Sequence, residues 1–167
     1  NEQGFDFKIL NDLAESIKEL ASKNIRISIV LGGGNFIRGS SFSNGVVDRV
    51  TSDYMGMLGT VINSLALQSN LEKINVPSRV MTAISINRVA EPYIKNKATK
   101  HLDKKRVVIF ASGTGNPFFS TDTAAVLRAS EMRSDVILKG TKVDGIYDKD
   151  PVANKDAEKI SKISYSE

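Results

Sequence analysis

The sequence contains no cysteine and a single histidine among its 167 residues. Without cysteine there is no disulfide framework, no thiol nucleophile and no thiolate metal site, a composition that suits a reducing compartment. The one histidine, His101, lies in a polar stretch, where we predict a surface residue. No Ser/His/Asp set and no zinc-ligand spacing is apparent. The sequence therefore disfavours both triad-based nucleophilic catalysis and a zinc site.

A membrane-spanning run and a secretory signal pattern are also absent, and the chain begins with Asn1-Glu2-Gln3. We therefore expect a cytoplasmic protein without a membrane partner. The formal net charge is +4, but the lysines are spread along the chain and form no stripe with interleaved aromatic residues. We expect no nucleic-acid partner, because a modest basic bias fits small anionic substrates equally well.

Apolar residues alternate between helical spacing and short β-branched runs along the whole chain. This pattern predicts an α/β fold, a three-layer sandwich with a mainly parallel sheet covered on both faces. With 41% hydrophobic residues, the length suits one domain over residues 1–167. The expected helices cover residues 9–21, 55–71, 91–104 and 121–133, and the expected strands cover residues 25–31, 79–84, 106–111 and 135–139.

Both ends of the sequence look cut. The chain opens on a predicted helix, whereas a parallel α/β sheet normally places a strand before its first crossover helix. It ends at Tyr165-Ser166-Glu167 after a polar stretch. We expect a first strand upstream and further sheet and helix downstream.

The run from Gly113 to Asp122 (GTGNPFFSTD) is the most informative segment. It follows an apolar strand and feeds a helix N-terminus, where open sheets bind ligands and free N–H groups favour phosphate. The alternative is an ordinary strand-to-helix turn, to which such residues also belong. The Asp122 carboxylate could organise a metal ion or a cationic group. Alternatively, it only interacts favourably with the dipole of the helix that it begins.

A second loop, Gly32 to Gly39 (GGGNFIRG), also follows a predicted strand. Its glycines allow close approach to a phosphate, and Arg38 can add a bidentate contact. Ile37 breaks the dinucleotide fingerprint and Ser40 replaces the Walker A lysine, so a simple P-loop enzyme is disfavoured. Asp53 could accept two hydrogen bonds from a ribose diol or cap a helix.

A third loop, Lys139 to Pro151, follows another predicted strand. Its lysines could meet donor phosphates and Tyr147 could lie beside a purine. The alternative is a solvated turn built on its Asp-Gly and Asp-Pro pairs.

Taken together, these segments resemble the amino acid kinase family, and within it the bacterial uridylate kinases. The resemblance runs from about Gly4 to the C-terminus and implies a UMP kinase that transfers the γ-phosphoryl group of ATP to UMP. The stretches that carry it are GGGNFIRG (32–39), RVTSDYMGMLGTVINSLAL (49–67), SGTGNPFFSTD (112–122) and LKGTKVDGIYDKDP (138–151).

The resemblance assigns a role to each position that matches the family's motifs. It implies that Arg38 and Asp122 serve the catalytic centre and that Asp53 binds the UMP ribose. The remaining UMP residues would be Gly33, Arg38, Thr114, Gly115, Asn116, Pro117, Phe118, Phe119, Ser120 and Thr121. The ATP residues would be Gly34, Arg38, Lys139, Thr141, Tyr147 and Asp150.

The resemblance further implies Mg²⁺ bound with ATP, a homohexamer, activation by GTP and inhibition by UTP. One departure stands out, because the family's K-x-S-G-E strand with its phosphoryl-stabilising lysine is not in the sequence. We expect the chain as given to be a poor catalyst. Two alternatives stay open: a nucleotide-sensing or storage relative without catalysis, and another amino acid kinase acting on a carboxylate or carbamate.

Overall fold

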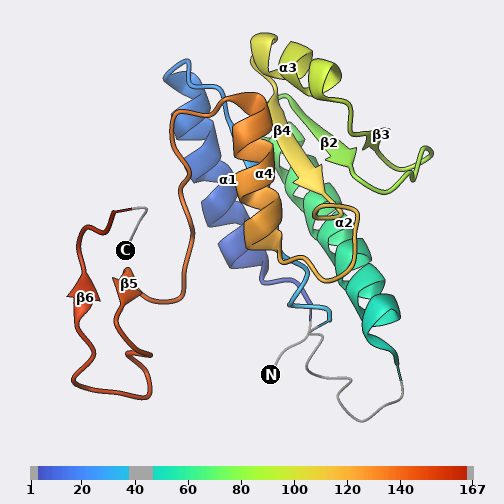
Figure 1. The fold of residues 1–167 in the computed structure, drawn as a ribbon. Helices are drawn as coiled ribbons and strands as arrows, with labels where there is room; N and C mark the ends of the chain where they lie inside the picture. The colour runs from blue at the N-terminus through green and yellow to red at the C-terminus, as the bar shows by residue number, and fades with distance from the viewer. Residues whose placement is uncertain (1–3, 38–46, 165–167) are drawn as a thin grey trace. The chain divides into compact units, whose positions relative to one another are not determined.

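The computed structural model describes residues 4–37 and 47–164 (Figure 1). The chain divides into two compact units, Asn1–Asp135 and Val136–Glu167, which are taken one at a time below. The expectation of one domain over residues 1–167 stays a prediction.

The first unit is built on a parallel sheet of four strands. These are β1 (Ser28–Val30), β2 (Ser78–Thr82), β3 (Glu91–Pro92) and β4 (Val107–Ala111), in the order β1-β4-β2-β3. The central strand β4 is fully buried, and its Ile109 pairs with Ile29 on one side and Val80 on the other. Because all pairs are parallel, the loops that follow β1 and β4 leave the sheet at the same edge.

Helices cover both faces of this sheet. The helices are α1 (Phe7–Ser22), α2 (Arg49–Lys73), α3 (Lys95–Asp103) and α4 (Thr121–Met132). On one face Ile17 of α1 and Leu67 of α2 pack with Ile109. On the other face Leu102 of α3 and Met132 of α4 pack with Phe110. The three layers and the α/β class are as predicted.

Side-chain caps explain where three of the helices begin. Asp6 accepts hydrogen bonds of 3.0 Å from the backbone N–H groups of the first turn of α1, and Asp48 does the same at α2 with a 3.1 Å bond from Thr51 N. At α4 the cap is Ser120, whose Oγ accepts from Thr123 N at 3.1 Å. Each cap satisfies N–H groups that the helix itself leaves without partners.

Two expectations around the third helix need correction. The predicted helix over residues 91–104 starts only at Lys95, because Glu91–Pro92 instead adds the edge strand β3 to the sheet. His101 is not a surface residue, since its side chain is only 14% exposed. It bonds Glu91 at 3.2 Å and Arg106 at 3.1 Å, which draws the ring against the edge of the sheet.

The expected strand over residues 135–139 is wrong. In the described chain this segment forms no strand ladder, and Val136, Ile137 and Leu138 are exposed. A β-branched run becomes a strand only when a neighbouring strand pairs with it. The second unit contains instead a two-stranded antiparallel ladder of β5 (Ile146–Tyr147) and β6 (Lys159–Ile160).

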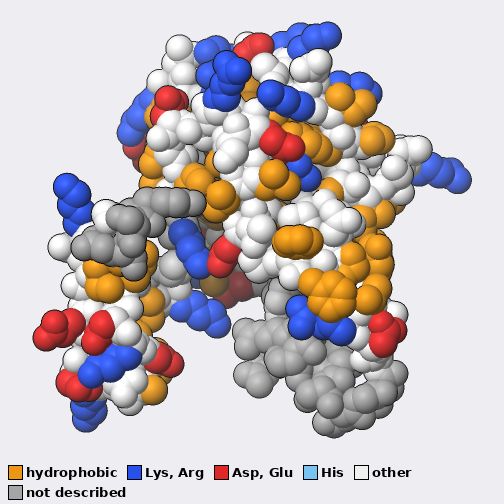
Figure 2. All heavy atoms as spheres, in the orientation of Figure 1, with side chains coloured by type: hydrophobic (Ala, Val, Ile, Leu, Met, Phe, Trp, Pro, Cys, Tyr) orange, Lys and Arg blue, Asp and Glu red, His pale blue; other side chains and the backbone are white. Residues whose placement is uncertain are grey.

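Charged side chains of both signs are interspersed on the surface drawn in Figure 2. This distribution agrees with the scattered lysines of the sequence. No helix within residues 4–37 and 47–164 is both long enough and apolar enough to span a bilayer.

Candidate functional site

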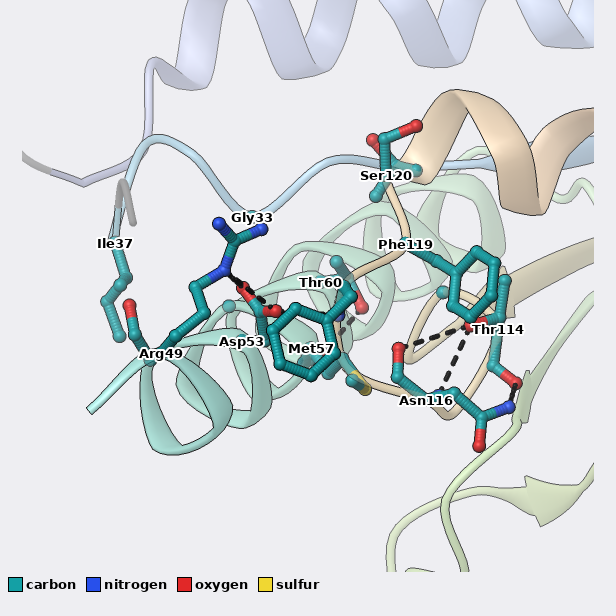
Figure 3. A pocket seen from close by; sticks show the side chains of 15 residues that line it. Gly33, Ile37, Arg49, Asp53, Met57, Thr60, Thr114, Asn116, Phe119 and Ser120 are labelled. Carbon is teal, nitrogen blue, oxygen red and sulfur yellow. Dashed lines mark hydrogen bonds and ion pairs between the residues drawn. The ribbon is translucent and has the colours of Figure 1, made fainter. Parts of the chain in front are cut away.

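An open pocket of about 480 Å³ lies where the loops after β1 and β4 approach the N-terminal half of α2 (Figure 3). Both loops leave the same edge of the sheet, which brings segments about 80 residues apart in sequence to one place. Helix α2 forms the wall that faces both loops. The lining residues are Gly33, Ile37, Arg49, Ser52, Asp53, Gly56, Met57, Thr60, Gly113, Thr114, Asn116, Phe118, Phe119, Ser120 and Thr121.

Among the described residues that line the pocket, Asp53 is the only acidic one. It lies in the second turn of α2 and not at its cap, which is Asp48. Arg49, one turn earlier, donates from Nε to both carboxylate oxygens at 2.9 and 3.0 Å. The backbone N–H of Phe118 donates to the same carboxylate at 2.7 Å. These bonds fix the carboxylate while leaving acceptor capacity for a ligand.

A second bond between α2 and the loop after β4 involves Thr60. Its hydroxyl donates to Met57 O at 2.7 Å and accepts from the backbone N–H of Ser112 at 2.7 Å. Ser112 and Phe118 both have a left-handed backbone, with φ of 64° and 70°. Such a conformation is unfavourable for residues other than glycine. Side chains of α2 therefore hold the two strained backbone positions of this loop.

Gly33 lies in close contact with the backbone of α2. A Cβ atom at Gly33 would be 2.4 Å from Gly56 O and 3.0 Å from Thr60 N. Asn63 adds a hydrogen bond of 2.7 Å to Gly32 O. Glycine at position 33 is therefore required for packing of the first loop against the helix, whatever a ligand also requires there.

The loop after β4 carries two exposed aromatic rings, Phe118 and Phe119, which are 66% and 60% exposed. The guanidinium of Arg49 lies 5.7 Å from the centroid of the Phe118 ring. Asn116 N donates to Thr114 Oγ1 at 3.2 Å, so the polar part of the loop is organised by its own side chains (Figure 3). Exposed rings beside hydrogen-bonding groups can stack on a planar base.

Most of the predicted UMP residues meet at this pocket. Gly115 and Pro117 of that set are described but do not line it, and neither does Asp122, the residue predicted to support the catalytic centre. Gly115 has a φ of 82° and faces Ala83, so it serves the turn, while Asp122 is exposed in the first turn of α4. Gly34 does not line the pocket, and Arg38 lies outside the described residues. The roles assigned to all these residues remain predictions.

The other predicted ATP residues belong to the second unit. Tyr147 donates to Asp144 at 2.6 Å, and Lys159 donates to the same carboxylate at 2.8 Å. The hydrogen bonds from Lys159 and Tyr147 lower the pKa of Asp144 to about 2. Thr141 donates to Val143 O, and Asp150 accepts from Val152 N at 2.9 Å. Lys139 is exposed. All four predicted positions keep their proposed ATP role as a prediction.

Sequence reasoning missed the part of the site that α2 supplies beyond Asp53. Arg49, Ser52, Gly56 and Thr60 recur at helical spacing and face the pocket with Asp53. A stripe of small and polar residues at helical spacing in the first half of α2 was the available signal. The loop residues Ile37 and Gly113 and the helix residue Met57 also line the pocket.

The part of the chain that the structure describes contains no group of three or more His, Asp or Glu side chains placed to hold a metal ion. The donors present therefore do not form a protein cage for Mg²⁺. Magnesium usually takes only one or two carboxylates and completes its shell with water and substrate phosphates.

The sequence model of the amino acid kinase family matches residues 1–167. The chain belongs to the amino acid kinase family. Among solved structures it is similar to the UMP kinase from Bacillus anthracis, with 45% identity and a TM-score of 0.88 over 94% of this chain and 65% of that one. It is also similar to the UMP kinase from Ureaplasma parvum, with 42% identity and a TM-score of 0.93 over 99% of this chain and 71% of that one.

A more distant match is the uridylate kinase from Archaeoglobus fulgidus, with 27% identity and a TM-score of 0.66 over 92% of this chain and 65% of that one. The chain thus spans between 65% and 71% of the length of these three structures. The resemblance to bacterial uridylate kinases is confirmed by the first two matches, as is the fold class.

Proposed function

We propose that this chain is part of an ATP-dependent UMP kinase, which transfers the γ-phosphoryl group of ATP to UMP and produces UDP and ADP for pyrimidine nucleotide synthesis. The observation that carries the proposal is the pocket in which Asp53 and the loop after β4 come together. The similarity to two bacterial UMP kinases at 42–45% identity supports the same substrate.

In this proposal the pocket holds the acceptor nucleotide. Asp53, fixed by Arg49 and by the Phe118 N–H, accepts a hydrogen bond from a ribose hydroxyl at the acceptor position that remains on Oδ1. The loop from Thr114 to Thr121 surrounds the uracil, and its aromatic rings offer a stacking surface. Phosphoryl transfer needs positioning and charge stabilisation more than covalent help from the protein. We assign the charge stabilisation to Arg38 and the support of the centre to Asp122.

ATP, the phosphoryl donor, would bind to Gly34, Arg38, Lys139, Thr141, Tyr147 and Asp150. Mg²⁺ would enter the site bound to the phosphates of ATP. The proposal also includes a cytoplasmic homohexamer that GTP activates and UTP inhibits. These parts rest on the family resemblance alone. Light scattering after size-exclusion chromatography tests the hexamer, and titration of GTP and UTP into the kinase assay tests the regulation.

The deciding experiment is a coupled ADP-release assay of the complete gene product with ATP and, in turn, UMP, CMP, carbamate and acetylglutamate. Turnover that is largely confined to UMP supports the proposal. Turnover with carbamate or acetylglutamate would instead identify another amino acid kinase. Tight UMP binding by calorimetry without turnover on any acceptor would identify a sensing or storage relative.

A further inference from the structure

Helix α2 contacts both loops of the pocket at the same residue, Thr60. The Thr60 hydroxyl accepts the Ser112 N–H at 2.7 Å, where the loop after β4 begins. The backbone nitrogen of Thr60 lies against Gly33 of the loop after β1, so closely that a Cβ there would be 3.0 Å from it. Thr60 is 2% exposed and lines the pocket. Thr60 is therefore a single residue of α2 that contacts both loops.

The hydroxyl of Thr60 differs from the other buried hydroxyl next to it in the helix. Ser64, one turn later, is also fully buried, and its Oγ bonds only to a carbonyl of its own helix, Thr60 O, at 2.7 Å. Thr60 makes such a bond to Met57 O, and it accepts the loop N–H in addition. Only one of these two hydroxyls reaches out of the helix to the site.

The residue that Thr60 holds is under strain. Ser112 is fully buried and has a φ of 64°, a conformation that costs a non-glycine residue about 1 kcal/mol or more. Its Oγ has no hydrogen-bond partner in the described structure, so the side chain does not fix this conformation. The backbone of Ser112 is held instead by the bond from its N–H to Thr60 and by the turn bond that its carbonyl accepts from Gly115 N at 2.9 Å. Releasing the bond to Thr60 leaves a buried N–H without a partner and allows the turn to relax.

We propose that Thr60 is a positioning residue for the acceptor nucleotide: it holds the first residue of the loop after β4 in a left-handed conformation and sets that loop at a fixed distance from the loop after β1. The inference rests on the proposed function for the identity of the nucleotide, UMP. Thr60 acts through Ser112 and the loop, and not by touching the reacting groups. Its loss therefore weakens binding of the acceptor and spares the donor.

The test compares Thr60→Val, which keeps the shape and removes the hydroxyl, with Thr60→Ser, which keeps the hydroxyl. Ser64→Ala is the matched control, because it removes a buried hydroxyl of the same helix that does not reach the loop. We expect Thr60→Val to raise the KM for UMP about tenfold, which corresponds to about 1.4 kcal/mol for a lost hydrogen bond. The KM for ATP should rise by less than about twofold, because Thr60 holds only the acceptor side of the pocket. Thr60→Ser and Ser64→Ala should stay within about twofold of the unchanged protein.

Amide hydrogen exchange of the peptide covering residues 110–120 provides a readout that needs no substrate. Thr60→Val should speed exchange in this peptide, and Ser64→Ala should not. If Thr60→Val yields too little folded protein, Thr60→Ala is measured in the same two ways. Equal kinetics and equal exchange in the Thr60 variant and the Ser64 variant would overturn the inference. Absence of UMP turnover in the unchanged protein would refute the proposed function, while exchange would still decide whether Thr60 positions the loop.

Discussion

The carboxylate of Asp53 accepts a hydrogen bond of 2.7 Å from the backbone N–H of Phe118, which lies 65 residues further along the chain. This bond joins the side chain proposed to bind the ribose to the loop proposed to bind the base. The two parts of the proposed nucleotide site are therefore joined by a hydrogen bond within the protein itself.

Asp53→Asn should raise the KM for UMP about tenfold and leave the KM for ATP nearly unchanged. The amide keeps one oxygen for the Phe118 N–H but loses the charge that pairs with Arg49 and strengthens a bond to a ribose hydroxyl. Steady-state kinetics with each nucleotide varied in turn measure the effect. Asp48→Asn is the control, since Asp48 caps the same helix outside the pocket. Equal loss for both nucleotides would indicate a damaged fold.

Arg38→Ala should lower UMP-dependent kcat/KM between tenfold and a hundredfold. This expectation comes from the sequence, because a charge-assisted contact between arginine and phosphate contributes about 1.5–3 kcal/mol. The coupled kinase assay measures it, with Arg26→Ala as the control at an exposed arginine outside the pocket. Unchanged kinetics would remove Arg38 from the site.

Gly33→Ala should destabilise the protein by about 1–3 kcal/mol, the usual range for an overpacked position. The new Cβ would lie 2.4 Å from Gly56 O, which belongs to the backbone of α2 and cannot move aside without bending the helix. Thermal unfolding measures the change. Gly56→Ala is the matched comparison, because a Cβ there meets no atom within 4 Å and should stabilise α2 by about 0.8–1.0 kcal/mol. A stability of Gly33→Ala equal to that of the unchanged protein would contradict the contact.

Arg128→Met should destabilise the first unit by about 1.5–3 kcal/mol. Arg128 is buried, lies 3.9 Å from the centroid of the Tyr93 ring and donates to Glu131 at 2.7 Å. Removing the guanidinium leaves the Glu131 carboxylate with one buried partner fewer. Chemical denaturation measures the loss. Arg26→Met, at an exposed pair with Asp103, should change stability by less than about 1 kcal/mol, and a similar loss in both variants would refute the prediction.

Stability should also fall in acid through Glu131. Burial acts to raise its pKa, but hydrogen bonds from Tyr93 and Arg128 outweigh burial and leave the pKa below its usual 4.5. The contribution of Glu131 to stability is therefore present above pH 4.5. It is lost as the pH falls through the lower pKa that Glu131 has in the folded protein. The unfolding midpoint of Glu131→Gln should lie below that of the unchanged protein at pH 7, and the difference should shrink as the pH falls below 4.5. A constant difference across this range would exclude the linkage.

The sequence predicted the layers of the fold because apolar spacing reports burial directly. Helices α1, α2 and α4 and strands β2 and β4 lie where their patterns place them. The two-residue strand β3 was missed because Glu91–Pro92 is too short for any alternation. Residues 135–139 have the composition of a strand, but composition does not reveal whether a partner strand is present.

The sequence predicted the loop residues of the site, because turn conformation depends on local sequence. It missed the helix residues, because only packing of distant segments brings them to the pocket. Glycines and Asn116 mark a loop in the sequence itself. Arg49 and Thr60 are ordinary helix residues until the fold places their side chains beside Phe118 and Ser112. The reason for glycine at position 33 likewise lies in Gly56 and Thr60 of α2, more than twenty positions along the chain.

The bonds that join α2 to the loop after β4 also have a consequence for the order of folding. Thr60 and Ser112 are 52 positions apart in the sequence, and Asp53 and Phe118 are 65 positions apart. Contacts between such distant residues form after local helices, because the loop-closure entropy has to be overcome first. The pocket proposed to hold the nucleotide therefore forms only once α2 has docked on the sheet. A chain that leaves the ribosome with its helices formed but undocked would not yet recognise its substrate.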